Sequence, residues 1–191
     1  MTKLVKKYNI QIPKEITAIY SKQKKTLTLL GPLGIKSKKL KVQIFINYVK
    51  KIINVSPILF SYSSKIERKK IQMIRNTTIS QIKYMLIESS VLLCKKLKIN
   101  GVGYRTNFTE NFDQKLLTFK LGYSHFIYVQ VLNSLLLNCL TKTKLCISGN
   151  SYENVSHLAA RIRDNKKPEP YKSKGVLYDN EIIILKEGKK V

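Results

Sequence analysis

Acidic residues are scarce in this chain of 191 residues, which has 11 Asp and Glu against 36 Lys and Arg. The formal net charge is therefore +25, and the isoelectric point is about 10.0. A small soluble domain usually has a net charge of roughly 2–8 in magnitude, because a larger excess repels itself. The imbalance indicates a polyanionic partner, either a nucleic acid or an acidic membrane surface.

Cysteine is also rare, and the three residues Cys94, Cys139 and Cys146 show no C-x-x-C spacing. An odd number of cysteines without that spacing fits neither a disulfide framework nor a zinc site. We expect these thiols to be small buried side chains in a reducing compartment.

Long apolar runs and catalytic motifs are absent from the sequence. The longest apolar stretch, Val131 to Leu140, is shorter than the roughly 18 residues that cross a bilayer, and it contains two Asn and one Ser. There is no Ser/His/Asp set and no GxGxxG, P-loop or HExxH motif, and the few carboxylates form no acid/base pair. We therefore expect no membrane insertion, no enzymatic activity, and no cofactor or metal ion.

Arginine, alanine and tryptophan are few as well, since five of the basic residues are Arg, three residues are Ala and none is Trp. Lys, Ile, Asn and Tyr are abundant instead, which is the composition that AT-rich codons produce. The start of the chain also lacks the features of a signal or transit peptide. We expect a protein made and used in a mitochondrion, with a plastid or a bacterial cytoplasm as alternatives.

Hydrophobic residues make up 43% of the chain, which is enough for a packed core. Their pattern predicts strands followed by a helix, and it does so twice. In the first half, the helix is expected over 68–94, no strand is assigned to 47–65, and the expected strands are 9–12, 17–20, 25–30 and 40–46. In the second half, the helix is expected over 151–163, and the expected strands are 97–108, 116–121, 126–131 and 144–149.

The two halves resemble one another, because residues 26–31 and 144–149 read alike and both end in glycine. We predict an α+β fold of two tandem similar domains, each a mostly antiparallel sheet packed against a helix. The domains are expected over 1–95 and 96–191. Asn150 and Glu153 are expected to cap the second helix, which is expected to stop near Asn165 because Pro168 and Pro170 force the chain to be extended.

The segment K-K-P-E-P-Y-K-S-K-G-V-L-Y at 166–178 combines prolines, cations and aromatic rings. The two prolines are expected to hold it in an extended path, with the lysines along one strip. Tyr171 and Tyr178 could then stack on exposed bases, and Gly175 could allow close approach to a phosphate. An ordinary basic surface loop is the alternative interpretation.

This segment closely resembles the signature near the C-terminus of the universal large-subunit ribosomal protein six family, R-x-P-E-P-Y-K-G-K-G-[VI]-R-Y. G-V-G-Y-R at 101–105, L-G-Y-S-H at 121–125 and A-A-R-I-R at 159–163 support the resemblance. I-Q-I-P at 10–13 and L-L-G-P-L-G at 29–34 match more weakly. These blocks occur in the family's order over nearly the whole chain, and the composition favours a mitochondrial member.

The resemblance implies a structural protein of the large ribosomal subunit, with large-subunit rRNA and neighbouring ribosomal proteins as partners and no homo-oligomer. The C-terminal domain and tail would bind 23S-type rRNA near the sarcin–ricin loop, beside the site where translational GTPases dock. By matching positions, the resemblance assigns RNA contacts to Arg163, Lys166, Lys167, Tyr171, Lys172 and Lys174, and less strongly to Tyr104, Arg105 and His125.

The chain departs from the family pattern in this tail. Lys166 and Leu177 stand where the family usually has Arg, which removes a bidentate group and a cation. Ser173 stands where the family has Gly, and Ser resists a positive φ.

The excess charge is concentrated in the first half, with 20 basic and 3 acidic residues in 1–95 against 16 and 8 in 96–191. Either the first half contacts additional RNA, or lysines have accumulated on a solvated face. A polybasic peripheral membrane protein is the competing function, although the second helix carries only Arg161 and Arg163 outside its apolar stripe.

Binding to ribosomal RNA is predicted to weaken steeply as salt is added, because lysines that contact phosphates release counterions. For about five contacts, the slope of log K against log salt concentration should be on the order of −4, with the coefficient for duplex DNA as a guide. Titrations at several salt concentrations measure this slope. An affinity that stays constant from low to physiological ionic strength would contradict the electrostatic mechanism.

Overall fold

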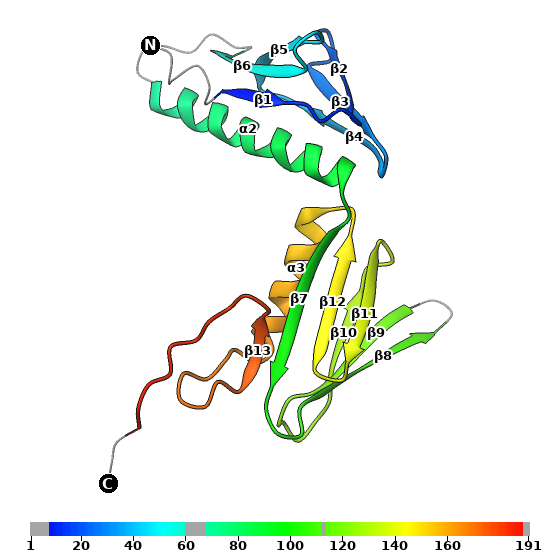
Figure 1. Cartoon of the computed structure of the whole chain (residues 1–191), viewed down its shortest axis with the longest axis vertical. Helices are drawn as coiled ribbons and strands as arrows, with labels where there is room; N and C mark the ends of the chain where they lie inside the picture. The colour runs from blue at the N-terminus through cyan, green and yellow to red at the C-terminus, as the bar shows by residue number, and fades with distance from the viewer. Residues whose placement is uncertain (1–7, 60–67, 112–113, 189–191) are drawn as a thin grey trace. The chain divides into compact units, whose positions relative to one another are not determined.

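The computed structural model describes residues 8–59, 68–111 and 114–188. The chain divides into two compact units, Met1–Val91 and Leu92–Val191 (Figure 1). The boundary predicted between residues 95 and 96 falls inside strand β7 (Leu93–Asn100). The prediction of an α+β fold with mostly antiparallel sheets is confirmed.

The first unit contains two antiparallel sheets, with strand orders β1-β6-β5 and β2-β3-β4, and the helix α2 (Arg68–Ser90). Its strands are β1 (Asn9–Gln11), β2 (Thr17–Ser21), β3 (Thr26–Gly31), β4 (Gly34–Lys39), β5 (Val42–Asn47) and β6 (Ile52–Leu59). Alternating side chains of both sheets and one face of α2 bury a common core. Its fully buried members include Leu27, Leu29, Ile44, Ile53 and Ile82.

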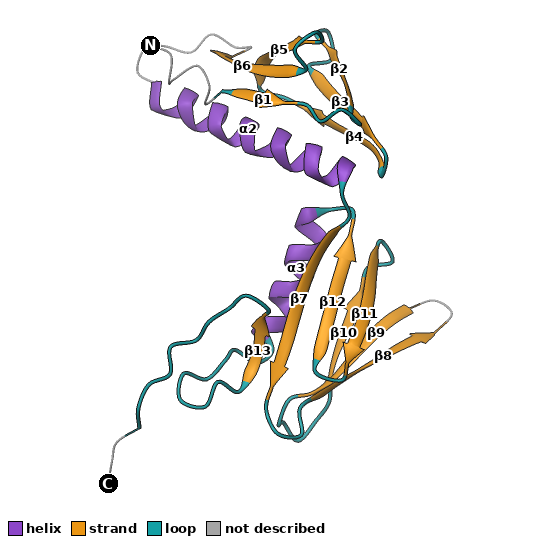
Figure 2. Cartoon of the chain, in the orientation of Figure 1, coloured by secondary structure: helices purple, strands orange, loops and turns teal. Residues whose placement is uncertain are grey.

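The second unit contains the sheets β10-β9-β8 and β11-β12-β7-β13 and the helix α3 (Tyr152–Asp164) (Figure 2). Its remaining strands are β8 (Arg105–Asn111), β9 (Gln114–Lys120), β10 (Ile127–Val131), β11 (Leu135–Thr141), β12 (Lys144–Gly149) and β13 (Gly175–Tyr178). The predicted apolar stripe of α3 is buried in full, and its members are Val155, Leu158, Ala159 and Ile162.

The strand order of the first unit recurs in the second. The sheet β1-β6-β5 corresponds to β7-β12-β11, the sheet β2-β3-β4 corresponds to β8-β9-β10, and α2 corresponds to α3. The second unit adds β13 at the free edge of β7. The duplication predicted from sequence therefore exists in the topology. The predicted match between residues 26–31 and residues 144–149, however, is wrong. β12 is equivalent to β6, and residues 26–31 form β3, which is equivalent to β9.

The sequence pattern did not predict four strands, β4, β6, β11 and β13. Their residues lack a clear one-sided apolar pattern, so they were assigned to loops or to no element. The first helix was predicted to reach residue 94, but it ends at Ser90. The hydroxyl groups of Ser89 and Ser90 donate to carbonyls one turn back, and the amide of Leu33 donates to the Ser89 carbonyl. These bonds replace the next helical turn.

Two further local predictions are wrong. The N-cap of α3 is Ser151, and it makes no side-chain capping hydrogen bond, so the predicted cap from Asn150 is not formed. The cysteines are not buried, since Cys94 and Cys139 are exposed and Cys146 is partly exposed. Strand alternation is the reason, because Leu97 and Ile99 take the buried face of β7 and leave Cys94 on the other face.

In the described part of the chain, neither helix is long and apolar enough to cross a membrane.

Gly31→Ala is predicted to destabilise the first unit. A Cβ atom on Gly31 would overlap the carbonyl oxygen of Ser89 and lie 2.8 Å from the Ser89 Cβ. Because the obstacle includes helix backbone, we expect the free energy of unfolding to fall by about 1–3 kcal/mol, as measured by urea denaturation.

Gly188→Ala is the matched control, since a Cβ atom there meets no heavy atom within 4 Å. If both variants lost the same amount of stability, the close approach of β3 to α2 at Gly31 would not be the cause of the loss.

Candidate nucleic-acid interface

Residues 165–174, between α3 and β13, form a closed loop. The amide of Glu169 donates to the Lys174 carbonyl, and the amide of Ser173 donates to the Glu169 carbonyl, both at 2.9 Å. The chain therefore reverses around Tyr171, and the prediction of an extended path is wrong. Each proline fixes only its own φ and restricts the residue before it, whereas these hydrogen bonds set the direction of the loop.

Gly175 lies where this loop enters β13, with φ at +145°. A Cβ atom there would lie 2.7 Å from the Pro168 Cα and 2.9 Å from the Lys166 carbonyl oxygen. The next amide, that of Val176, donates to the same carbonyl at 2.9 Å. Gly175 therefore permits the chain to approach itself closely, and its approach to a phosphate stays a prediction.

Ser173 has a φ of +52°, in the left-handed region that favours glycine. The serine occupies the conformation that the family's glycine would adopt without strain. The loop hydrogen bonds and the buried strand after it hold this conformation, so the substitution leaves the loop closed.

The predicted tail residues differ in how far they reach solvent. Lys167, Tyr171 and Lys172 are exposed, and the Tyr171 side chain is 54% accessible. Lys166 and Lys174 are partly buried, because they lie where the two ends of the loop meet. Tyr171 is therefore presented to solvent, and it is not among the residues that pack on the core.

A second loop, residues 121–126 between β9 and β10, meets the first. The hydroxyl of Tyr123 donates to the Asn165 carbonyl at 3.2 Å, and the Lys166 ammonium lies 4.4 Å from the Tyr123 ring centroid. The ring of His125 stacks on the same tyrosine, with centroids 5.7 Å apart. The structure thus brings two predicted residues, Lys166 and His125, against the ring of Tyr123, which was not among the predicted site residues.

Tyr104 connects the third loop, between β7 and β8, to the second. Its partly buried ring packs against the core and fills the space beside Gly101 and Gly122. A Cβ atom on either glycine would come within 2.9 Å of that ring. Tyr104 therefore positions these loops, and most of its ring is not available for stacking on a base.

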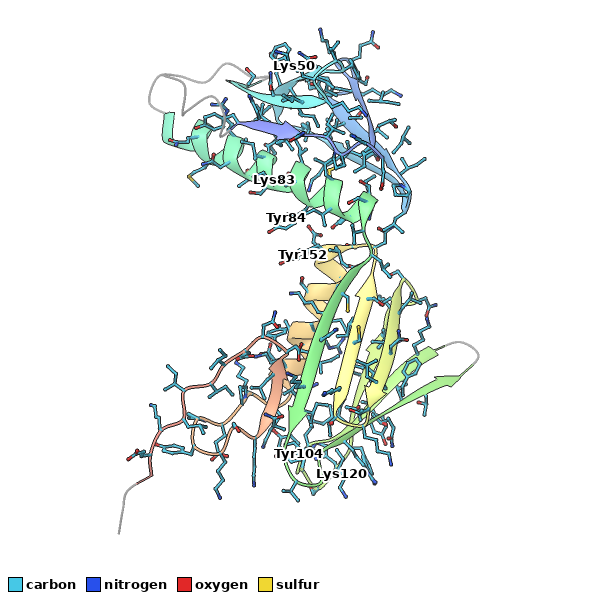
Figure 3. All side chains as sticks on the ribbon, viewed as in Figure 1. Lys50, Lys83, Tyr84, Tyr104, Lys120 and Tyr152 are labelled. Atoms are coloured by element: carbon cyan, nitrogen blue, oxygen red, sulfur yellow. The ribbon has the colours of Figure 1, made fainter. Side chains whose placement is uncertain are left out.

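We call residues 101–105, 120–126 and 165–174 the basic loop surface; it consists of the three loops and the adjoining strand residues Arg105 and Lys120. These segments lie at one end of the second unit, because Gly175 pairs with Asn100 and Arg105 pairs with Lys120. Tyr104 and Lys120 mark this end in Figure 3.

Like charges face one another on the strands that carry this surface. Arg105 lies directly opposite Lys120 in the β8–β9 ladder, and Lys98 lies opposite Lys144 in the β7–β12 ladder. Opposed like charges destabilise a sheet unless an anion lies between them. Lys98 has such an anion in Asp179, 2.6 Å away. Lys98, Lys120 and Lys144 were missed from the sequence, because strand register is needed to bring them together.

Arg163 is held within the protein. Its guanidinium forms a two-pronged ion pair with Glu181, with Nε–Oε2 and Nη2–Oε1 distances of 3.1 and 2.5 Å. Glu181 also accepts the amide of Tyr178 at 3.2 Å. The hydrogen bond from Arg163 lowers the pKa of Glu181, and the hydrogen bond to Glu181 raises the pKa of Arg163. The pair fixes the segment after β13 against α3.

The basic loop surface provides cations and aromatic rings and contains no candidate metal centre. Among the described residues, no group of three or more His, Cys, Asp or Glu side chains could hold a metal ion. Exposed ammonium groups can neutralise phosphates, and an exposed tyrosine ring can stack on a base.

Comparisons with known proteins agree with these features. The sequence pattern of the family described as Ribosomal protein L6 matches residues 100–179, a range that contains every predicted RNA-contact residue. The chain is 33% identical to large ribosomal subunit protein uL6 of Paramagnetospirillum magneticum, over 97% of this chain and 98% of that protein. It is 35% identical to uL6 of Mycoplasmoides gallisepticum, over 94% and 92%, and 32% identical to uL6 of Cereibacter sphaeroides, over 95% of each.

Glu181→Gln is predicted to make stability less sensitive to acid. A carboxylate whose pKa is lowered by folding stabilises the folded state above its unfolded pKa, which is about 4.3 for Glu. That contribution is lost as pH falls through the lowered folded pKa, and the Gln variant lacks it at every pH. Free energies of unfolding measured from pH 7 to pH 3 should therefore fall more steeply for the unmodified protein than for the variant.

Glu187→Gln serves as the control, because residue 187 is exposed in the same segment. It should follow the acid profile of the unmodified protein. If the two variants gave the same profile, the ion pair with Arg163 would not be the source of the acid sensitivity.

Proposed function

The chain belongs to the ribosomal protein L6 family, and on this premise we propose that its basic loop surface binds 23S-type ribosomal RNA. Members of this family are structural components of the large ribosomal subunit and are not enzymes, so the chain is a structural constituent of that subunit. The proposed contact lies near the sarcin–ricin loop, beside the docking site of translational GTPases, as the family resemblance implies.

The observation that supports this proposal most directly is that one surface carries several cations and an exposed tyrosine, while the one ion pair of its lysines among the described residues, Lys167 with Asp164 at 3.7 Å, is open to solvent. Arg105 and Lys120 oppose each other across one ladder, and the exposed Lys167 and Lys172 belong to the loop that turns at Tyr171. RNA phosphates placed between these cations would relieve their repulsion and release counterions. Bases in a single-stranded or looped region could stack on the tyrosine ring.

The predicted residues take different roles in this proposal. Lys167, Lys172, Lys174 and Arg105 neutralise phosphates, and Tyr171 stacks. Lys166 and His125, which both lie against the Tyr123 ring, contact the RNA together with that ring. Arg163 and Tyr104 act as positioning residues, since Arg163 is paired with Glu181 and Tyr104 fills the space between two loops.

The wider setting follows from the family. Large-subunit rRNA and neighbouring ribosomal proteins are the partners that membership implies, and contact with translational GTPases is part of our proposal. We also propose a mitochondrial ribosome as the location, on the basis of the lysine-rich composition; the relatives compared above are bacterial. The membrane-binding alternative is not needed, because rRNA accounts for the excess positive charge.

Tyr171→Ala is predicted to weaken binding to large-subunit rRNA by about 1–3 kcal/mol, the range for losing one stacked base. Because the ring is exposed, the melting temperature should stay unchanged. Affinity is measured with an rRNA fragment containing the sarcin–ricin loop, and stability by thermal denaturation.

Tyr128→Ala is the matched control, since Tyr128 is a tyrosine of similar exposure, 61% against 54%, on β10 and outside the basic loop surface. It should leave both quantities unchanged. A Tyr171 variant that melts earlier but binds normally per folded molecule would remove the ring from the RNA interface.

A further inference from the structure

Two cysteines meet on adjacent strands of the sheet β11-β12-β7-β13. In the ladder between β7 and β12, Cys94 lies opposite Ser148 and Cys146 lies opposite Lys96. The two thiols are therefore diagonal neighbours on the same face of the sheet. Their sulfur atoms are 2.6 Å apart, closer than sulfur atoms that merely pack together normally approach.

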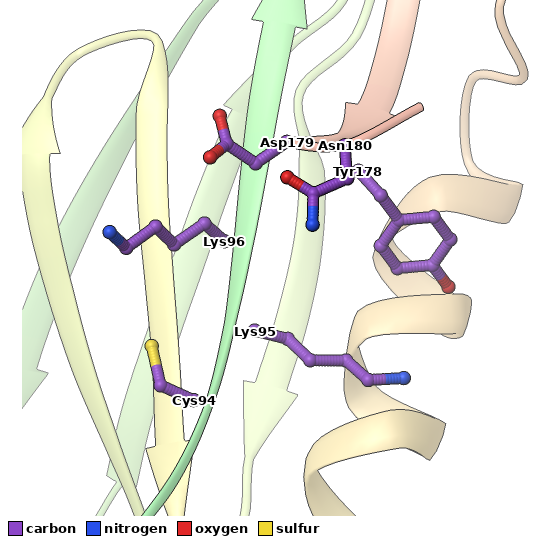
Figure 4. A pocket seen from close by; sticks show the side chains of 6 residues that line it. All are labelled: Cys94, Lys95, Lys96, Tyr178, Asp179 and Asn180. Carbon is purple, nitrogen blue, oxygen red and sulfur yellow. The ribbon is translucent and has the colours of Figure 1, made fainter. Parts of the chain in front are cut away.

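This face of the sheet is open to solvent at Cys94, whereas Cys146 is partly exposed and Ser148 is buried. Leu97 and Leu145 project to the opposite face, where they join the core beneath α3. Cys94 is exposed and lines a pocket with Lys96, Asp179 and three further residues. Figure 4 shows Cys94 and Lys96 on one side of β7, with Lys95 and Tyr178 on the other. A small water-soluble oxidant can therefore reach the Cys94 sulfur.

We propose that Cys94 and Cys146 form a reversible redox pair, which a peroxide converts into an intramolecular disulfide and a dithiol reductant restores. The site is separate from the proposed RNA-binding function, because none of its residues belongs to the basic loop surface. It rests on the register of β7 and β12 and on the contact between the two sulfur atoms.

The reaction assigns a different task to each thiol. Burial and the hydrogen bond with Cys94 raise the pKa of Cys146 to about 11, so this thiol stays protonated at neutral pH. The exposed Cys94 sulfur, as its thiolate, attacks one peroxide oxygen. An S–O bond forms, the O–O bond breaks, and the departing hydroxide takes up a proton and leaves as water.

The second step closes the disulfide. The Cys146 sulfur loses its proton and attacks the Cys94 sulfur, so that an S–S bond forms and the S–O bond breaks. The departing hydroxide takes up that proton and leaves as a second water. Two electrons have then passed from the two thiols to the peroxide.

The exposed position of Cys94 makes this disulfide accessible to reduction. Exposed disulfides are among those with the more oxidising potentials of reversible sites, whereas buried structural disulfides resist the reductants of the cell.

The third cysteine provides an internal comparison. Cys139 lies on β11 opposite Leu145, so its side chain leaves the sheet on the face away from Cys146. It is nevertheless exposed. Exposure alone therefore does not determine which thiols can form the disulfide. The face of the sheet on which each thiol lies does.

The test treats the folded full-length protein with hydrogen peroxide and digests it with trypsin without reduction. The expected product joins peptide 84–95 to peptide 145–161, has lost two hydrogen atoms, and separates again with dithiothreitol. Cys139, in peptide 121–142, should remain available for alkylation. In urea, cross-linking should slow by roughly tenfold or more, because the sulfurs are no longer held together.

Matched variants make the result decisive. Cys139→Ser should leave the cross-link intact, whereas Cys94→Ser and Cys146→Ser should each abolish it while thermal denaturation shows that they remain folded. The proposal is overturned if folded protein yields Cys94 sulfinic acid without a cross-link, forms disulfides between chains, or cross-links no faster than in urea.

Discussion

The loop that carries the candidate RNA contacts has its shape because the chain after it returns to the core. β13 pairs with β7 from Gly175 opposite Asn100 to Tyr178 opposite Leu97, and Val176 and Leu177 are buried. The closed loop must therefore span the distance between the end of α3 and this strand, and its two ends are fixed in the core. Its lysines project from a constrained backbone, so less conformational entropy is lost when they are ordered against phosphates.

That anchoring divides the cations of the second unit into two groups. Arg163 and Lys98 have internal carboxylate partners in Glu181 and Asp179, and both partners belong to the segment just after β13. These pairs hold the segment in place. In the preceding loop, Lys172 is exposed and Lys167 forms a solvent-exposed pair with Asp164 at 3.7 Å, so both ammonium groups remain accessible to an external anion. The scarcity of acidic residues makes this division possible, since few other carboxylates compete for the loop lysines.

Local patterns predicted those elements whose burial is one-sided. The alternation of 26–31 and 144–149 and the helical spacing of 151–163 each identified a real element. Failure followed where pairing is distant in sequence or where polar residues occupy both faces. β4 is the clearest example: it reads G-I-K-S-K-K and is stabilised as an edge strand by backbone bonds to β3. β13 is another, because its partner β7 lies some 75 residues earlier and no local signal reports that pairing.

The candidate site shows the same limit. A family signature could indicate the tail residues, but it could not distinguish a residue that faces solvent from one that holds the loop. Tyr171 and Arg163 are both part of the matched blocks, yet one is exposed at the turn and the other is paired with Glu181. Ser173 makes a related point about conformation. Because a serine occupies a φ of +52° here, the closed loop is imposed by its anchors and not by the preference of that residue. Lys166 stands where the family usually has arginine, and its ammonium group cannot bind a phosphate in the bidentate geometry of a guanidinium. The rigid backbone of the loop is then what remains to orient its charges toward an RNA surface.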